Sequence, residues 1–308
     1  MNNYENKENK DHSFDPKTTR KIKIEPDGKI LVVPTDFPTI QDAVNAAKPG
    51  DTIEVLEGVY FENVRITTDR ITIQSREDET VVLNGTGLSG TGFEIEQAER
   101  VKIRGFFIVS YATGIFVGGK DHCIADIVAT ENSTFGIVIR GQNQTVEDSE
   151  FFVNGAAGIN VSDRNHTIRN CSLGREFIGI ANVSSGAICN NIFNCTITDS
   201  SIGFLWGAFE SKDNVIFRNL LFRNEYGIVM HSSDNTIRNN IIQGQKQDGV
   251  AILADQITVE QNIISGNQIG LAIVGNNNNI IKNTIIGNTL KNIVDNGKDN
   301  KIVNTSSC

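Results

Sequence analysis

The chain has 308 residues, a hydrophobic content of 39% and a formal net charge of −9 at pH 7. This acidic balance excludes nucleic acid as the main partner, because binding to the phosphate backbone requires concentrated Lys and Arg side chains. The 28 glycines and 5 prolines are typical of many short strands joined by tight turns.

The N-terminus is highly charged and almost without apolar side chains, so a disordered polar tail is predicted over residues 1–18. This segment lacks the apolar centre of a secretory signal, and no apolar run of the chain reaches the roughly 18 residues that a membrane span needs. We therefore expect cytosolic synthesis without export by the usual signal route, which is compatible with deposition on a spore or particle surface.

Residues 19–34 contain two short apolar segments, Lys21–Ile24 and Ile30–Val33, around a turn at Pro26-Asp27-Gly28. We expect both to form short strands that pair locally, pack on the main domain or are donated from it.

Residues 39–47 carry the pattern of a short amphipathic helix. Thr39 is a candidate N-cap, apolar residues recur at helical spacing from Ile40 to Ala47, and Pro49-Gly50 terminates the pattern. A helix with one apolar face can cover the open end of a stack of strands. We predict that it caps the N-terminal end of a domain spanning residues 35–305.

A glycine recurs through two thirds of the chain at intervals of 21 to 24 residues. A short apolar strand follows almost every one, as in Gly136-Ile137-Val138-Ile139. A unit of this size cannot bury its own apolar face, so successive units must stack into a solenoid. The anchors are Gly92, Gly114, Gly136, Gly158, Gly179, Gly203, Gly227, Gly249 and Gly270.

A second row consists of Asn and Asp residues placed eight to ten residues before the next anchor. Side chains stacked on identical neighbours can hydrogen-bond along the column, about 4.8 Å per coil, which offsets the cost of burying them. The row therefore predicts an asparagine ladder inside the solenoid. Its members are Asp126, Asp148, Asn170, Asn194, Asn219, Asn240, Asn262 and Asn283, with Asn304 beyond the last anchor.

With turn sequences such as Gly141-Gln142-Asn143, the repeat resembles the right-handed parallel β-helix repeats of the pectate-lyase-like superfamily over about residues 29–305. Residues 235–253 resemble the copper-binding-repeat subgroup of that superfamily. The resemblance implies an all-β fold, a single-stranded right-handed parallel β-helix of about 10 to 12 coils with an N-terminal capping helix. It implies less about function, because this fold hosts lyases, hydrolases, epimerases, adhesins and inert scaffolds.

The far end of the repeat is expected to lack a cap. Residues 306–308 form a short C-terminal tail, and no helix pattern precedes them. An open solenoid end invites strand addition by another chain.

Side chains along a strand point alternately to its two faces, so the second and fourth residues after each anchor glycine are predicted to point outward. In catalytic members of the superfamily, carboxylates and basic residues project from an exposed sheet, and these positions form no such cluster. They become apolar toward the C-terminus, and we interpret that ribbon as an interface covered by the N-terminal tail or another subunit. Scattered exposed apolar residues without consequence are the alternative. The ribbon comprises Leu205, Val229, Ala251, Leu253, Ala272 and Val274.

Two consecutive 24-residue coils contain extra residues that should form a local protrusion, and the first of their anchors is Gly179. An exposed Trp beside carboxylates is a common way to stack a sugar ring, although alternation points the only Trp inward, where it would fill a widened coil. The candidates for ligand binding are Trp206, Phe209 and Lys212, and the weak candidates for a catalytic acid and base are Glu210 and Asp213.

Cys171 and Cys195 each follow a member of the second row and should lie on adjacent coils, close enough for a disulfide or for thiol packing. The cysteines show no paired metal spacing. His122 and His166 fall in one row two coils apart, too far for one metal ion, and we expect solvated turn residues. With two Met and four dispersed His, copper ligands are missing, so no metal or cofactor is predicted. Cys308 is placed to cross-link another chain.

The predicted function is a non-enzymatic structural or assembly protein with weak carbohydrate binding, deposited on a spore coat or similar layer. Its expected partners are further copies of the chain, in a homo-oligomer or filament through the tail, the apolar ribbon or the open C-terminal end, and a polysaccharide. The characteristic motifs of polygalacturonases, pectate lyases, pectin methylesterases and alginate epimerases are missing. The alternative is a polysaccharide lyase, glycoside hydrolase or epimerase acting on an acidic polysaccharide.

Overall fold

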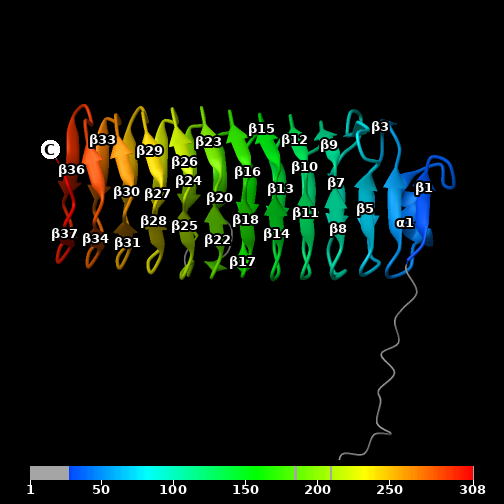
Figure 1. The fold of residues 1–308 in the computed structure, drawn as a ribbon, viewed down its shortest axis with the longest axis horizontal. Coiled ribbons are helices and arrows are strands. Elements are labelled where there is room, and N and C mark those ends of the chain that lie inside the picture. Colours follow the sequence, from blue (N-terminus) through cyan, green and yellow to red (C-terminus); the bar gives the residue numbers. More distant parts are fainter. Residues whose placement is uncertain (1–27, 184–185, 209, 308) are drawn as a thin grey trace, which may run out of the picture.

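A computed structural model describes residues 28–183, 186–208 and 210–307. In this part of the chain, three parallel sheets wrap around one core to form an elongated right-handed solenoid (Figure 1). The predicted β-helix is thereby confirmed. The expected tail over residues 1–18 and the strand at Lys21–Ile24 lie outside the described residues.

Each complete coil contributes one strand to each sheet, in the order C, A, B. Sheet A contains β1 (Ile30–Val33), β2 (Thr52–Val55), β5 (Thr72–Ser75), β8 (Lys102–Arg104), β11 (Cys123–Ala125), β14 (Thr145–Glu147), β18 (Thr167–Arg169), β22 (Asn191–Phe193), β25 (Val215–Phe217), β28 (Thr236–Arg238), β31 (Thr258–Glu260), β34 (Asn279–Ile281) and β37 (Lys301–Val303). Sheet B contains β3 (Gly58–Tyr60), β6 (Val81–Asn84), β9 (Phe106–Val109), β12 (Val128–Thr130), β15 (Glu150–Phe152), β19 (Ser172–Gly174), β23 (Thr196–Thr198), β26 (Leu220–Phe222), β29 (Ile241–Gln243), β32 (Ile263–Ser265) and β35 (Thr284–Ile286). Sheet C contains β4 (Val64–Ile66), β7 (Thr91–Ile95), β10 (Thr113–Val117), β13 (Phe135–Ile139), β16 (Ala157–Val161), β20 (Ile178–Asn182), β24 (Ile202–Trp206), β27 (Tyr226–Met230), β30 (Asp248–Ile252), β33 (Ile269–Ile273) and β36 (Lys291–Asp295). A small extra pair joins β17 (Asp163–Arg164) to β21 (Ala187–Ile188).

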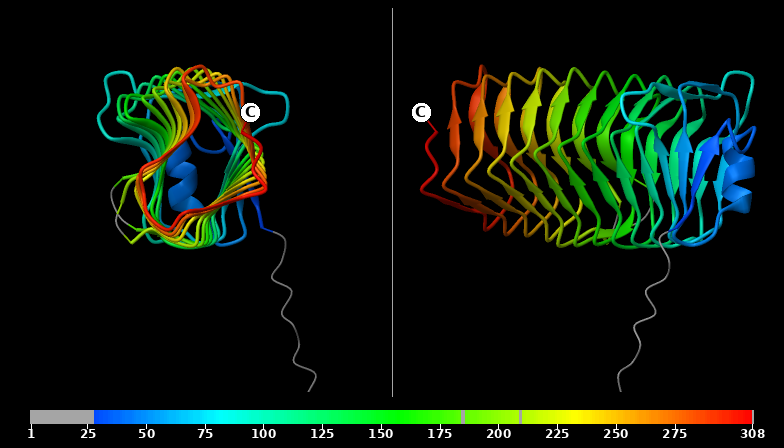
Figure 2. Two further views of the ribbon diagram at one scale, coloured as in Figure 1. Left: turned by 90° about the vertical axis from the view of Figure 1, so that its left-hand side faces the viewer. Right: turned by 45° about the vertical axis from the view of Figure 1, so that its right-hand side comes forward.

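Helix α1 (Ile40–Ala46) lies across the N-terminal end of the solenoid, as Figure 2 shows. Thr39 caps it by accepting a hydrogen bond from the Asp42 backbone N–H. The Glu62 carboxylate accepts the free N–H groups of Ile40 and Gln41, which the helix itself cannot satisfy. The apolar side chains of the helix are buried against the first strands, so the capping helix of the predicted fold is present.

The anchor glycines let successive coils approach closely. A Cβ atom added to Gly136 would lie 2.6 Å from the carbonyl oxygen of Gly158, one coil further on. The following positions, such as Ile137 and Ile139, are fully buried in the core. The inward positions inferred from the repeat therefore hold, but the second positions Val138, Asn160 and Ala181 in the middle of sheet C are buried as well.

All three corners of the solenoid follow one rule. A residue with positive φ turns the chain and the next residue points inward. On most coils this inward residue is polar and hydrogen-bonds to the coil before it, whereas residues such as Ile127 and Ile257 are apolar exceptions. At the corner between sheets A and B, Asn239 turns the chain with φ 57°, and the buried Asn240 accepts the backbone N–H of Asn219 at 2.9 Å. Three polar ladders therefore run through the solenoid, where the sequence had suggested one.

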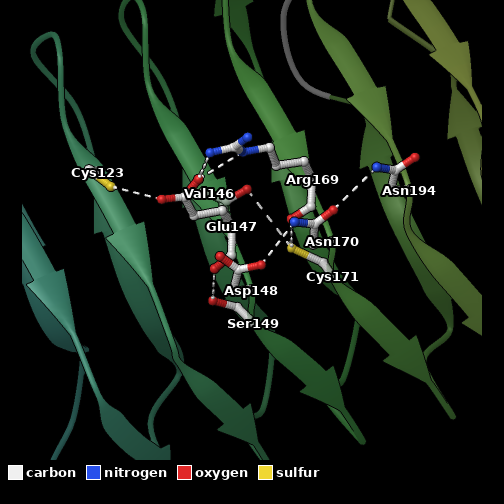
Figure 3. Close-up of polar contacts among 9 residues, drawn as sticks. All are labelled: Cys123, Val146, Glu147, Asp148, Ser149, Arg169, Asn170, Cys171 and Asn194. Atoms are coloured by element: carbon white, nitrogen blue, oxygen red, sulfur yellow. Dashed lines mark hydrogen bonds and ion pairs between the residues drawn. The ribbon is translucent and has the colours of Figure 1, made fainter. Parts of the chain in front are cut away.

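The predicted ladder row was wrong in its first half and at its last member. Asp126, Asp148, Asn170, Asn194 and Asn304 are the positive-φ residues of the A–B corner, and all five are exposed. Their side chains interact on the outside, where Asn170 donates to Asp148 and Asn194 donates to Asn170 (Figure 3). The error has a physical cause, because Asn and Asp suit both a left-handed backbone and an inward polar position.

The expectation of solvated turn histidines was also wrong. His122 and His166 are buried members of the ladder at the corner between sheets C and A. Each ring accepts a backbone N–H of the previous coil, from Val101 at 3.0 Å and from Gln144 at 3.1 Å. They replace the Asn that occupies this position further along.

At the C-terminal end, the three ladders finish on polar side chains of the last coil. Asn292 accepts from Asn288, Thr305 accepts from the backbone N–H of Asn283, and Asp295 accepts from Asn300. Asp295 occupies the inward position that Ile273 fills one coil earlier. This end thus differs from the N-terminal end, which a helix covers. No helix in the described part of the chain is long and apolar enough to cross a membrane.

Candidate functional site

The protrusion does not present its Trp to solvent. Trp206 is 0% exposed and stacks in register with Met230 in the core, so it cannot contact a ligand at the surface. Lys212, Glu210 and Asp213 are exposed on the turn that follows. Phe209 lies outside the described residues. Ligand binding by Lys212 and catalysis by the two carboxylates stay predictions.

The apolar ribbon exists as a continuous row on the outer face of sheet C. Leu205, Val229, Ala251 and Ala272 are Cα partners on successive strands and are half-buried. The side chains at the fourth position after the anchor glycine are more exposed, with Leu253 at 43% and Val274 at 57%. What covers this row stays a prediction.

A charged groove of about 520 Å³ runs across four coils at the corner between sheets B and C. It lies over the turns that follow β19, β23, β26 and β29. On each of these coils a positive-φ residue points outward just before the inward ladder residue, and a further residue follows the ladder residue at the surface. Four neighbouring turns therefore supply the whole lining. That lining consists of Arg175, Glu176, Asp199, Ser200, Ser201, Arg223, Glu225, Gly244 and Lys246.

Asp199 and Arg223 form a fixed pair in the middle of the groove. Nε of Arg223 lies 2.9 Å from Oδ1 of Asp199, and Nη2 lies 2.8 Å from Oδ2. The guanidinium also lies over the Phe222 ring, 4.7 Å from its centroid. Hydrogen bonds from Arg223 lower the pKa of Asp199, so this carboxyl stays ionised. Two-point contact gives the pair a defined geometry.

Glu176 replaces an amide of the B–C ladder with a carboxyl. It is 4% exposed, and its two oxygens accept the backbone N–H and the Nδ2 of Asn154, both at 2.8 Å. Burial raises the pKa of Glu176 to about 7, and the hydrogen bonds from Asn154 oppose that rise. The charge of the groove therefore changes near neutral pH.

Two cations flank the Asp199–Arg223 pair. Arg175 and Lys246 are exposed, and neither forms an ion pair with another described residue. Three coil steps separate them, about 14 Å at the usual strand spacing. Both cations can contact an anionic ligand, in a lining that carries three basic and three acidic side chains.

A shallow depression of about 230 Å³ on sheet B lies beside the groove, since Gly174 and Thr198 of its lining directly precede Arg175 and Asp199. Phe152, Gly174 and Thr198 are Cα partners on adjacent strands, and the missing side chain of Gly174 opens the space between the other two. Thr196 adds a second hydroxyl to the lining. An aromatic face beside hydroxyl groups suits a sugar ring.

Sequence reasoning missed this site. The groove residues lie on corners, whereas the alternation rule covers only the strands. The signal available was Glu176 itself, a carboxyl at the position where later coils carry Asn224 and Asn267.

Comparison with known proteins shows the family. The model of the family described as periplasmic copper-binding protein (NosD) matches residues 44–226, more than half of the chain. The chain belongs to the NosD family. A right-handed β-helix region is matched over residues 204–307. No curated protein sequence matches the chain at a significant level.

Several solved structures share the fold at low identity. The alginate lyase from Paenibacillus sp. str. FPU-7 is 16% identical, with a TM-score of 0.64 over 76% of this chain and 95% of the lyase. XylC in complex with xylose is 12% identical, with a TM-score of 0.67 over 84% of this chain and 75% of XylC. A tailspike of E. coli bacteriophage HK620 in complex with a pentasaccharide is 11% identical, with a TM-score of 0.69 over 86% of this chain and only 61% of the tailspike. At these identities the likeness shows the fold alone.

The described residues do not fit the copper that the family description implies. Copper sites use His, Cys and Met donors that converge on one point. His122 and His166 are occupied in a ladder, and the Met230 sulfur lies in the core. No group of three or more His, Cys, Asp or Glu that could hold a metal ion occurs within the described segments.

Proposed function

We propose that this chain binds an anionic polysaccharide along the groove at the B–C corner and does not cleave it. The observation that carries the proposal is the pair of free cations, Arg175 and Lys246, at the two ends of a groove that crosses four coils. A linear polymer lying along the solenoid axis would meet both, with the Asp199–Arg223 pair between them and the depression of sheet B beside it. Carbohydrate complexes among the structures of the same fold support the ligand class.

Two of the three carboxylates of the groove, those of Glu176 and Asp199, favour binding over catalysis. Both oxygens of Glu176 are hydrogen-bonded to Asn154, and both oxygens of Asp199 are hydrogen-bonded to Arg223. A general acid or base must instead reach the bond that reacts. The alternative, glycosidic bond cleavage, is favoured by one observation, because a carboxyl with a pKa of about 7 suits a general acid.

Calorimetric titration with polygalacturonate and with alginate tests the proposal. We expect saturable binding at low salt, on the order of tenfold weaker for Arg175→Gln and for Lys246→Gln, since each removes a charge-assisted contact. Lys282→Gln is the matched control, because this exposed Lys occupies a positive-φ position at the A–B corner, outside the groove. Equal affinities for all three variants would show that the polysaccharide does not bind in this groove. Product release that Glu176→Gln abolishes would support the catalytic alternative.

We also propose self-association through the apolar ribbon, as part of a deposited layer on a spore or particle surface. Exposed Leu253 and Val274 on one face support this, since apolar groups in a row are stabilised by removal from water. Light scattering after size exclusion should show oligomers that Leu253→Asp with Val274→Asp disperses. A monomer at all concentrations would exclude the assembly.

A further inference from the structure

The ladder at the A–B corner is interrupted by two cysteines. Amide side chains occupy the inward position without a gap from Asn219 to Asn283. In the two preceding coils the same position holds Cys195 and Cys171, both 1% exposed. The backbone N–H of Cys195 still donates to Asn219 at 2.9 Å, whereas no amide side chain connects the two cysteines.

The register of the flanking strands brings the two thiols together. Arg169 pairs with Phe193 just before the corner, and Ser172 pairs with Thr196 just after it. Cys171 and Cys195 are therefore equivalent positions on adjacent coils, about 4.8 Å apart along the stack, within the range of Cα separations that a disulfide spans.

The two side chains also point the same way. The Cys171 sulfur lies 3.3 Å from the carbonyl oxygen of Arg169, and the Cys195 sulfur lies 3.4 Å from that of Phe193 (Figure 3 shows Cys171). Both contacts join a cysteine to the residue two positions earlier. Both thiols are free in this structure, and the neighbouring thiol of Cys195, together with burial, raises the pKa of Cys171.

We propose that Cys171 and Cys195 form a disulfide that joins adjacent coils when the chain folds in oxidising surroundings. With oxidised glutathione as the oxidant, one cysteine thiolate attacks a glutathione sulfur, forms a mixed disulfide and releases one glutathione thiolate. The second cysteine thiolate then attacks the protein sulfur of that mixed disulfide and releases the other glutathione. The two cysteines lose two protons and two electrons, and the oxidant becomes two reduced glutathione molecules.

The bond forms before the corner is fully packed, because thiols that are buried with a raised pKa react slowly. It closes a loop of 24 residue steps, Cys171 to Cys195, and so restricts the unfolded chain. It also links the two coils that supply Arg175 and Asp199 to the groove.

The test uses the full chain with Cys123→Ser, Cys189→Ser and Cys308→Ser, so that only the two ladder cysteines remain. The protein is refolded with reduced and oxidised glutathione, unfolded in denaturant and treated with a maleimide, and its intact mass is measured. We expect no maleimide addition, a mass lower by two hydrogen atoms, and a Tm about 5 °C above that of the reduced sample. Two maleimide additions to a sample with the native circular dichroism spectrum would overturn the proposal.

Peptide mapping of the natural chain after the same treatment provides a second measurement, which does not depend on the folding of the variant. A cross-linked peptide pair that contains Cys171 and Cys195 is the expected result. Exclusive pairing of either residue with another cysteine, or recovery of both as free thiols, would contradict it. Cys195→Ser in the two-cysteine background should take one maleimide and show no Tm difference between the two redox conditions.

Discussion

The A–B corner and the B–C corner follow the same backbone rule and carry different chemistry. At both, a positive-φ residue turns the chain and a polar residue enters the core. At the A–B corner a strand of sheet B follows at once, so each coil exposes only one turning residue, such as Asp148 or Asn170. At the B–C corner further residues follow before the next strand, and side chains such as Glu225 and Lys246 line a groove. The inward residue holds the coils together, and the outward residues of the longer corner are free to bind.

The largest expected effect is on the free energy of unfolding, which should fall much more when the inward residue of a corner is replaced than when its turning residue is. Asn240→Ala leaves the backbone N–H of Asn219 buried without an acceptor and removes one of the two acceptors of its Nδ2 group, so we expect a loss of about 3 kcal/mol in the free energy of unfolding. Asn239→Ala, at the exposed position next to it, should cost about 1 kcal/mol, because it only places a side chain without local hydrogen bonding at positive φ. Urea unfolding followed by circular dichroism measures both. Equal losses would refute the division of roles.

The next effect concerns the inward carboxyl of the B–C corner. The pKa of Glu176 is raised in the folded chain to about 7, so its contribution to stability is greatest below the unfolded pKa near 4.5 and is lost as pH rises through 7. Glu176→Gln removes this dependence while keeping the shape, as Gln245 does at the same position three coils later. At pH 8 we expect the variant to be more stable by roughly 2 to 3 kcal/mol, and at pH 4 to equal the natural chain. Thermal unfolding at both pH values measures this, and a pH-independent difference would contradict it.

A smaller effect follows for binding. The groove loses one negative charge when Glu176 is protonated, so an anionic polysaccharide should bind several-fold more tightly at pH 6 than at pH 8. In Glu176→Gln the affinity should stay the same at both pH values. Titration calorimetry at constant ionic strength tests this. A pH dependence that survives in the variant would place its origin in another group.

The smallest effect concerns strain at a turning residue. Val153 holds φ 60° at the B–C corner, where β-branched side chains are disfavoured and later coils carry glycine. Val153→Gly should therefore stabilise the chain by about 1 kcal/mol. Val274→Gly is the control, since this exposed valine has no positive φ and the change should not stabilise. Differential scanning fluorimetry suffices, and a lower Tm for Val153→Gly would show that the side chain contributes more than the strain costs.

The solenoid could be predicted because its period depends on one repeated steric requirement, the close approach at glycines such as Gly136. The inward position of Trp206 followed from the same alternation. The ladders could not be assigned correctly, since Asp148 and Asn219 look alike in sequence and serve two different purposes. The groove was missed because Arg175 and Lys246 are ordinary charged turn residues until the stack brings their coils side by side. The raised pKa of Glu176 comes from burial, which residue type alone does not reveal.

A crystal structure of the chain soaked with a galacturonate hexasaccharide would show directly where an anionic polysaccharide binds. We expect an extended sugar chain along the turns that follow β19 to β29, with carboxylates at Arg175 and Lys246. An ordered saccharide on the protrusion at Glu210 and Asp213, or on the outer face of sheet C, with no sugar at the B–C corner, would contradict this expectation.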